Sequence, residues 1–185
     1  TIVMNRDTIV VKEPLCVKRS LVLMMDHSGS MTGKKILTAA LCTGVLSHAL
    51  RDEEFVVLLF SSEVYALKEI DKRKDIHSLI REILEQQPKG FTDIKGALER
   101  GVEQMEKASC KVKMGILITD GIHTTEDPVP TAEGYQTLHV VGVPSARGKV
   151  INVENCKKLA KAGRGKFLML KNYEDIPSTV LKLLA

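Results

Sequence analysis

Residues 20–31 read "SLVLMMDHSGSM", a continuous apolar run followed at once by polar residues. An apolar run of this length between polar neighbours is typical of a central parallel strand that is covered on both faces. The strand is expected to end at residue 25, before Asp26, and Ser28, Gly29 and Ser30 follow. A carboxylate and two hydroxyls therefore stand where a buried strand has just ended. On their own, the two serines could equally cap the N-terminus of a helix.

Apolar runs and helical patterns alternate along the rest of the chain. We expect further strands at 53–60, 64–70, 112–119, 137–143 and 166–170. We expect helices at 34–50, 75–87, 94–106 and 153–162, a closing helix from about Asp175, and a loop at 121–136. This alternation predicts an α/β fold, a three-layer sandwich with a mostly parallel central sheet and helices on both faces.

The helix expected at 34–50 carries an apolar stripe at three- and four-residue steps, which predicts its buried face. The stripe consists of Leu37, Ala40, Leu41, Gly44, Val45 and His48. His48 is accordingly expected in the core or at its edge. Lys34 and Lys35 open the same helix and are expected to lie in a solvated first turn, although their charges could also steer acidic partners.

Three polar positions are expected at one edge of the sheet, which we call the rim. In α/β folds ligands bind beyond the carboxyl ends of the strands, near the point where the strand order reverses. Asp26 follows the strand at 20–25, Asp120 follows the strand at 112–119, and Thr92 lies in a loop before a helix. We therefore expect all three at the rim.

The donor groups at this rim are hard oxygen ligands. Asp26 and Asp120 offer carboxylates, and Ser28, Ser30 and Thr92 offer hydroxyls. Such a set suits Mg²⁺ or Mn²⁺, held octahedrally at about 2.0–2.2 Å, with room for one more anionic oxygen. Simpler interpretations exist for each segment: Asp120-Gly121 alone is typical of a turn. Thr92-Asp93 alone is typical of a helix cap, and Asp93 favours that role over metal binding.

Three motifs together resemble one known family. "DHSGSM" resembles the D-x-S-x-S motif of von Willebrand factor type A domains, the metal-ion-dependent adhesion site. "GFTDIKGAL" resembles the second element of that site, a Thr just before a helix, and "LITDG" resembles the third, an Asp-Gly after a buried strand. The motifs occur in the family's order. The resemblance extends over residues 18–185, and residues 1–17 are expected to form an extra strand or hairpin.

The resemblance implies a metal site and a way of using it. Ser28, Ser30 and Thr92 would reach the metal through their hydroxyls, Thr92 either directly or through water. Asp26 and Asp120 would hold coordinated waters and orient the serines. A Glu or Asp of a protein partner would fill the remaining position. The implied function is a metal-dependent protein-interaction module, not an enzyme, acting in a larger complex such as a MoxR-type AAA ATPase system.

Two other functions remain open from the residues. One is an extracellular adhesion or ligand-binding domain of the same family. The other is a Mg²⁺-dependent hydrolase, which the residues support less, because the usual aspartyl nucleophile occurs in a D-x-D pattern and Ser28 stands in the second position. There is also no Gly-rich phosphate loop.

Composition argues against some classes of function and indicates a cellular location. The 185 residues carry a net charge of +4, and aromatic residues make up only 4% with no Trp, which argues against a base-stacking nucleic-acid module. No apolar stretch reaches the roughly 18–20 residues needed to cross a bilayer. Cys16, Cys42, Cys110 and Cys156 lie far apart with no C-x-x-C pair. Free thiols in a reducing compartment, and hence a cytoplasmic location, are expected.

Overall fold

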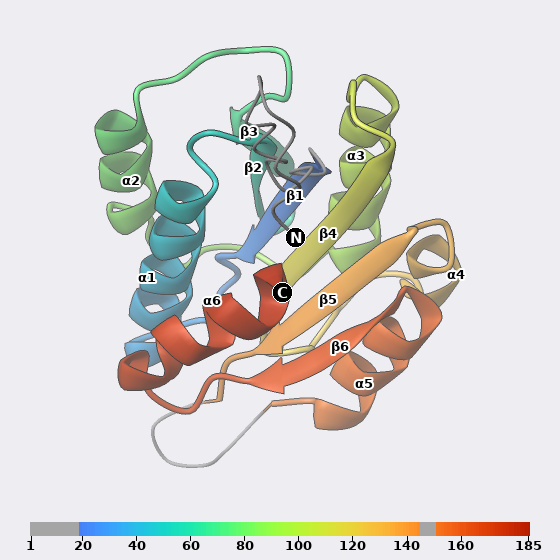
Figure 1. The fold of residues 1–185 in the computed structure, drawn as a ribbon. Helices are drawn as coiled ribbons and strands as arrows, with labels where there is room; N and C mark the ends of the chain where they lie inside the picture. The colour runs from blue at the N-terminus through green and yellow to red at the C-terminus, as the bar shows by residue number, and fades with distance from the viewer. Residues whose placement is uncertain (1–18, 145–150) are drawn as a thin grey trace, which may run out of the picture.

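Six strands form one mixed sheet in the order β3-β2-β1-β4-β5-β6 (Figure 1). The computed structural model describes residues 19–144 and 151–185. Strand β3 pairs antiparallel with β2, and every other neighbouring pair is parallel. The strands are β1 (Arg19–Asp26), β2 (Glu54–Phe60), β3 (Val64–Lys68), β4 (Val112–Thr119), β5 (Thr137–Gly142) and β6 (Arg164–Met169). The extra strand or hairpin expected at residues 1–17 lies outside the described residues.

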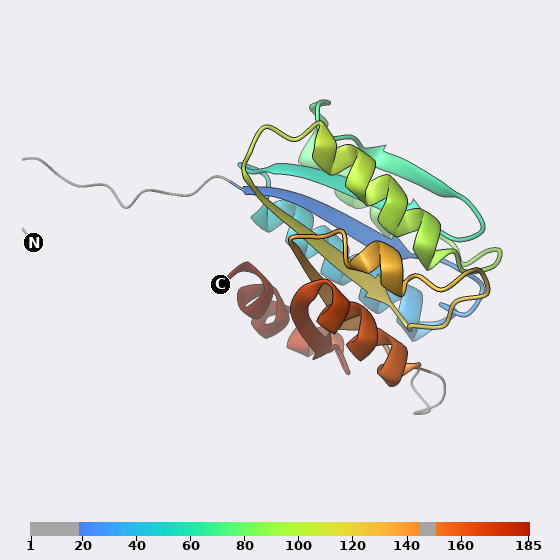
Figure 2. The same ribbon diagram turned by 90° about the vertical axis from the view of Figure 1, so that its right-hand side faces the viewer.

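Helices cover both faces of this sheet. One face carries α1 (Lys34–Ala49), α2 (Ile76–Leu84) and α6 (Ile176–Leu184), which follows the 3₁₀ turn η1 (Tyr173–Asp175). The other carries α3 (Ile94–Glu106), α4 (Val129–Ala132) and α5 (Val153–Ala162), and Figure 2 looks onto this second layer with the sheet and α1 behind it. The predicted three-layer α/β sandwich is confirmed. The short helix α4 lies inside the stretch expected to be a loop.

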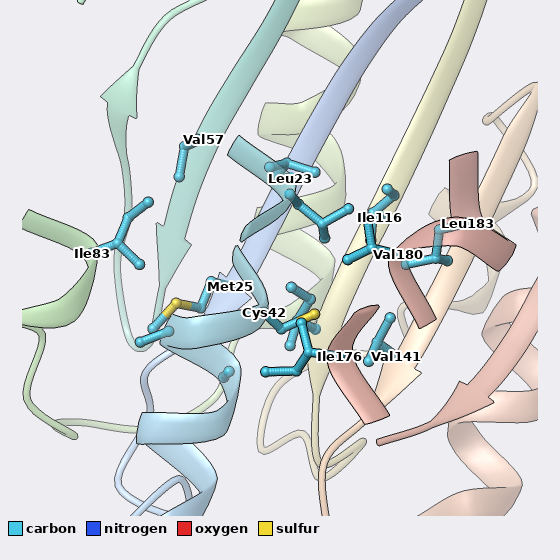
Figure 3. Close-up of a cluster of buried hydrophobic side chains, with 14 of the residues drawn as sticks. Leu23, Met25, Cys42, Val57, Ile83, Ile116, Val141, Ile176, Val180 and Leu183 are labelled. Carbon is cyan, nitrogen blue, oxygen red and sulfur yellow. The ribbon is translucent and has the colours of Figure 1, made fainter. Parts of the chain in front are cut away.

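The central strand β1 is buried on both faces. Leu21, Leu23 and Met25 pack toward α1, α2 and α6, whereas Val22 and Met24 pack toward α3, α4 and α5, and none of the five is exposed. Figure 3 shows part of the first core, where Leu23 and Met25 lie among side chains from α1, α2 and α6. Burial on both faces explains why this strand is apolar at consecutive positions.

The buried face of α1 differs from the predicted stripe. Leu37 and Val45 are 53% and 42% exposed, and His48 is exposed too, so the predictions for these three residues were wrong. The buried face consists of Lys35, Thr38, Ala39, Ala40, Cys42, Thr43, Gly44, Leu46 and Ser47. Thr43 fits on this buried face because its Oγ1 donates to the Ala39 carbonyl at 2.8 Å. Because α1 has apolar residues on its exposed side as well as on its buried side, the apolar pattern did not identify the face that packs against the sheet.

The strand order reverses between β1 and β4. From β1 the chain continues to β2 and β3 on one side, and β4, β5 and β6 lie on the other. Parallel pairing sets Met25 opposite Ile118, so the carboxyl ends of β1 and β4 lie side by side, at the lower end of both strands in Figure 1. The topology therefore brings the residues after the two strands together at the reversal point.

Two further findings concern membranes and cysteines. Within residues 19–144 and 151–185 the structure has no helix with the length and apolar character to cross a membrane. Cys42, Cys110 and Cys156 are free, and Cys16 lies outside the described residues. Burial raises the pKa of the Cys42 thiol to about 12, so this thiol stays protonated at neutral pH.

Candidate metal centre

Asp26 is the last residue of β1, and it is fully buried. Its Oδ1 accepts a hydrogen bond from the Ser28 backbone N–H at 2.9 Å, and its Oδ2 accepts one from the Thr119 hydroxyl at 2.6 Å. Burial raises the pKa of Asp26 to about 6, against the effect of these bonds, and the negative charge of Asp120 adds to the rise. The ionised carboxylate would therefore be stabilised by a cation placed next to it.

Ser28 and Ser30 present their hydroxyls side by side. Their Oγ atoms are 3.2 Å apart, with Ser28 fully buried and Ser30 half-buried. The alternative role as helix caps is wrong for α1, because the capping position is Gly33 and no side chain bonds to the first turn. The loop is held by the backbone instead, since Gly29 N–H donates to the Gly90 carbonyl at 2.9 Å.

Thr92 lies in the loop before α3 and is 3% exposed. This loop joins the β1–α1 loop through Lys89 N–H, which donates to the His27 carbonyl at 2.9 Å. It joins the loop after β4 through Thr92 N–H, which donates to Thr124 Oγ1 at 3.1 Å. The expected cap is confirmed at the next residue, where Asp93 Oδ1 accepts from Gly96 N–H at 3.0 Å. Thr92 therefore sits between the two loops that carry the predicted carboxylates.

Asp120 follows β4 and is fully buried. Its Oδ1 accepts from Ile122 N–H at 3.1 Å, and its Oδ2 lies 2.6 Å from the ammonium of Lys35. The next residue must be glycine: Gly121 has φ +74°, and an added Cβ would lie 2.5 Å from Cys156 Sγ and 2.6 Å from the Asn152 carbonyl. The tight turn after Asp120 thus fixes the carboxylate at the end of β4.

Two contributors to the rim were not predicted. Lys35, expected in a solvated turn, is only 4% exposed, because its ammonium donates to the Ser30 carbonyl at 3.1 Å and to Asp120. Thr119 accepts from Gly121 N–H at 3.0 Å while its own hydroxyl donates to Asp26. Thr119 could have been noticed in the "LITDG" motif, since it ends the strand that pairs with β1. No sequence pattern signals that Lys35 folds inward.

The donor chemistry of the rim fits a hard divalent cation. The set combines the carboxylates of Asp26 and Asp120 with hydroxyls of Ser28, Ser30 and Thr92, which suits Mg²⁺ or Mn²⁺ better than Zn²⁺, whose usual ligands are nitrogen and sulfur. The described ranges 19–144 and 151–185 hold no cluster of three or more His, Cys, Asp or Glu that could bind a metal. The proposed site contains only two such residues, Asp26 and Asp120, and its other donors are hydroxyls, so it does not belong to that class of cluster.

The sequence of this chain matches the model of one known family. The family model of the von Willebrand factor type A domain matches residues 20–182. No curated protein sequence gives a significant match.

Solved structures share the fold at low sequence identity. A von Willebrand factor type A protein from Catenulispora acidiphila has a TM-score of 0.75 at 19% identity, over 89% of this chain and 41% of its own. BatB from Bacteroides thetaiotaomicron has a TM-score of 0.73 at 18% identity, over 89% and 98%. Manganese-loaded TRAP protein from Plasmodium vivax has a TM-score of 0.71 at 20% identity, over 87% and 71%.

Proposed function

The chain belongs to the von Willebrand factor type A domain family, and we propose that it binds a protein partner through a divalent cation at the rim. Members of this family serve as protein-interaction and adhesion modules. The cation is Mg²⁺ or Mn²⁺, and the partner supplies a Glu or Asp side chain. Ser28, Ser30 and Thr92 would hold the cation through their hydroxyls, and Asp26 and Asp120 would orient them and accept hydrogen bonds from its waters.

One observation carries this proposal: two buried carboxylates converge where β1 and β4 end, next to a pair of hydroxyls 3.2 Å apart. The Lys35 ammonium compensates the charge of Asp120, and burial of the second charge, on Asp26, is costly unless a further cation compensates it. When bound, a hard divalent cation supplies positive charge and open coordination positions that take a further anionic oxygen. The manganese-loaded state of the structurally similar TRAP protein supports the choice of metal.

We extend the proposal to the setting of the domain, a cytoplasmic location with a partner such as a MoxR-type AAA ATPase complex. The free thiols of Cys42, Cys110 and Cys156 support a reducing compartment. A disulfide joining any of these cysteines in protein isolated under non-reducing conditions would contradict it. Extracellular adhesion is the alternative within the same family.

Thermal unfolding with and without Mg²⁺ tests the metal site. A cation that binds the folded state at about 100 times its Kd stabilises it by about 2.7 kcal/mol, which raises Tm by about 5–10 °C in a domain of this size. Asp26→Asn should abolish this rise. It should not lower the Tm measured in EDTA, because the mutation also removes a buried negative charge.

The matched control is Asp52→Asn, which removes an 85% exposed carboxylate in the turn before β2, at the other end of the sheet. It should keep the full Mg²⁺ response. An unchanged Tm of the wild-type protein at saturating Mg²⁺ and Mn²⁺ would rule out the proposed site.

A further inference from the structure

Lys35 brings a positive charge next to Asp120, one of the two carboxylates of the proposed cation site. Its side chain is 5% exposed, and its ammonium lies 2.6 Å from Asp120 Oδ2. It also donates to the carbonyl of Ser30, 3.1 Å away, so it links the loop after β1 to the end of β4. This ammonium therefore contacts two of the three segments that supply the predicted ligands, the loop after β1 and the end of β4.

The position of Lys35 is unfavourable apart from these contacts. A buried ammonium loses its hydration, and a positive charge in the first turn of a helix opposes the helix dipole. Lys35 is the second residue of α1, whereas its neighbour Lys34 is exposed. Asp120 offsets the cost of burial, so the two charges form a pair that depends on both partners.

The charge balance of the rim gives this pair a functional consequence. The carboxylates of Asp26 and Asp120, when ionised, carry two negative charges, and the Lys35 ammonium reduces the sum to one. A divalent cation would bring the sum to one positive charge, and a single carboxylate from outside would bring it to zero. Without Lys35 the cation would already neutralise the rim, and an added carboxylate would leave an uncompensated negative charge.

We propose that Lys35 acts as a built-in cation that weakens metal binding at the rim and strengthens the binding of an acidic group to the metal-loaded rim. The proposal rests on the proposed function, and it names a specificity-determining residue outside the predicted ligand set. Like charges at short range repel, so the ammonium disfavours the metal, and the same ammonium attracts an incoming carboxylate.

The test uses Lys35→Met, which keeps the length of the side chain and removes its charge. Binding of Mn²⁺, followed by electron paramagnetic resonance of the free ion, should become at least about tenfold tighter than in the wild type. Acetate serves as the acidic probe, and its binding is measured by the fall in water proton relaxation when it displaces water from bound Mn²⁺. Acetate should bind the Mn²⁺-loaded variant at least about threefold more weakly.

Lys34→Met is the matched control, since it removes the same charge from the adjacent exposed residue. It should change neither affinity by more than about twofold. A merely structural role for Lys35 would not move the two affinities in opposite directions. Unchanged or weaker Mn²⁺ binding by Lys35→Met, or unchanged acetate binding, would overturn the proposal.

The remaining outcomes separate this proposal from the proposed function. If the wild type binds no Mn²⁺ but Lys35→Met does, the proposed function fails, whereas the part of the proposal in which Lys35 weakens metal binding is supported. If neither binds Mn²⁺, both fail. If Lys35→Met does not fold, Lys35→Gln replaces it. Should both variants fold only with Mn²⁺, the metal would be replacing the lost charge, which supports the proposal, whereas failure to fold even with Mn²⁺ would overturn it.

Discussion

The hydroxyl of Thr119 connects the two strand ends that carry the carboxylates of the rim. It donates to Asp26 at 2.6 Å and accepts from the N–H of Gly121 at 3.0 Å, all within buried surroundings. A group that hydrogen-bonds to a metal-ligating side chain fixes the orientation and charge distribution of that side chain. Losing such a group typically lowers metal affinity about tenfold to a hundredfold. If the rim binds a cation, Thr119 is therefore expected to position Asp26.

Thr119→Val should weaken Mg²⁺ binding about tenfold or more, because Asp26 loses a hydrogen bond that holds its carboxylate. Thr119→Ser keeps the hydroxyl and should bind Mg²⁺ within about threefold of the wild type. Calorimetric titration with Mg²⁺ measures both affinities. Wild-type affinity in Thr119→Val would show that Asp26 is positioned without this bond.

Residue by residue, the sequence could predict the groups that a linear motif contains. Three short motifs contain the five predicted residues, Asp26, Ser28, Ser30, Thr92 and Asp120. In the structure Asp26 ends β1, Asp120 follows β4, and the other three lie in loops at the same edge of the sheet. The inward turn of Lys35 could not be predicted. It depends on an ion pair with a residue 85 positions away, which no local pattern specifies.

Among the elements, α1 shows why a periodic pattern can point to the wrong face. Leu37 and Val45 recur at helical spacing but are exposed, while Cys42, Thr43 and Leu46 pack against the sheet. Val45 lines a pocket between the two helices together with Leu41 and His48 of α1 and Ile80 and Leu84 of α2, whereas Leu37 does not. Packing against α2 therefore accounts for part of the stripe, which the sequence could not distinguish from contact with the sheet.

Glu54, at the start of β2, connects neighbouring segments at the end of the sheet opposite the rim. Its carboxylate accepts hydrogen bonds from the Ser20 hydroxyl, from Ser109 N–H at 3.0 Å and from Cys110 N–H at 3.4 Å. Partial burial works to raise the pKa of Glu54, but these bonds outweigh it and hold the pKa below the usual value of 4.5. Glu54 thus joins β1, β2 and the turn before β4 in a charge-dependent way.

Glu54→Gln should lower the free energy of unfolding by about 1 kcal/mol at pH 7. Because the pKa is lower in the folded state, the charged group stabilises the fold above the unfolded pKa, and this contribution is lost as pH falls through the folded pKa. The difference between variant and wild type should therefore shrink below about pH 4. Urea unfolding at pH 7 and pH 3.5 measures it, with exposed Glu63→Gln as the control. A difference that stays constant with pH would contradict the charge-dependent role.

At the scale of the whole molecule, the reversal of strand order between β1 and β4 creates the rim. Alternating strands and helices were enough to predict the three-layer sandwich and to place Asp26 and Asp120 at the carboxyl ends of strands. The sequence did not state that β1 and β4 are neighbours. That adjacency follows from the long-range pairing that sets Met25 opposite Ile118, and it brings two distant carboxylates into one site.

Binding of a divalent cation at this rim can be seen directly in a crystal soaked in Mn²⁺. The anomalous scattering of manganese locates the ion independently of the protein model. One strong peak is expected at the rim, about 2.0–2.2 Å from the hydroxyl oxygens of Ser28 and Ser30, and no peak there in crystals of Asp26→Asn. A rim without an anomalous peak at saturating Mn²⁺, or a peak that persists there in Asp26→Asn, would contradict it.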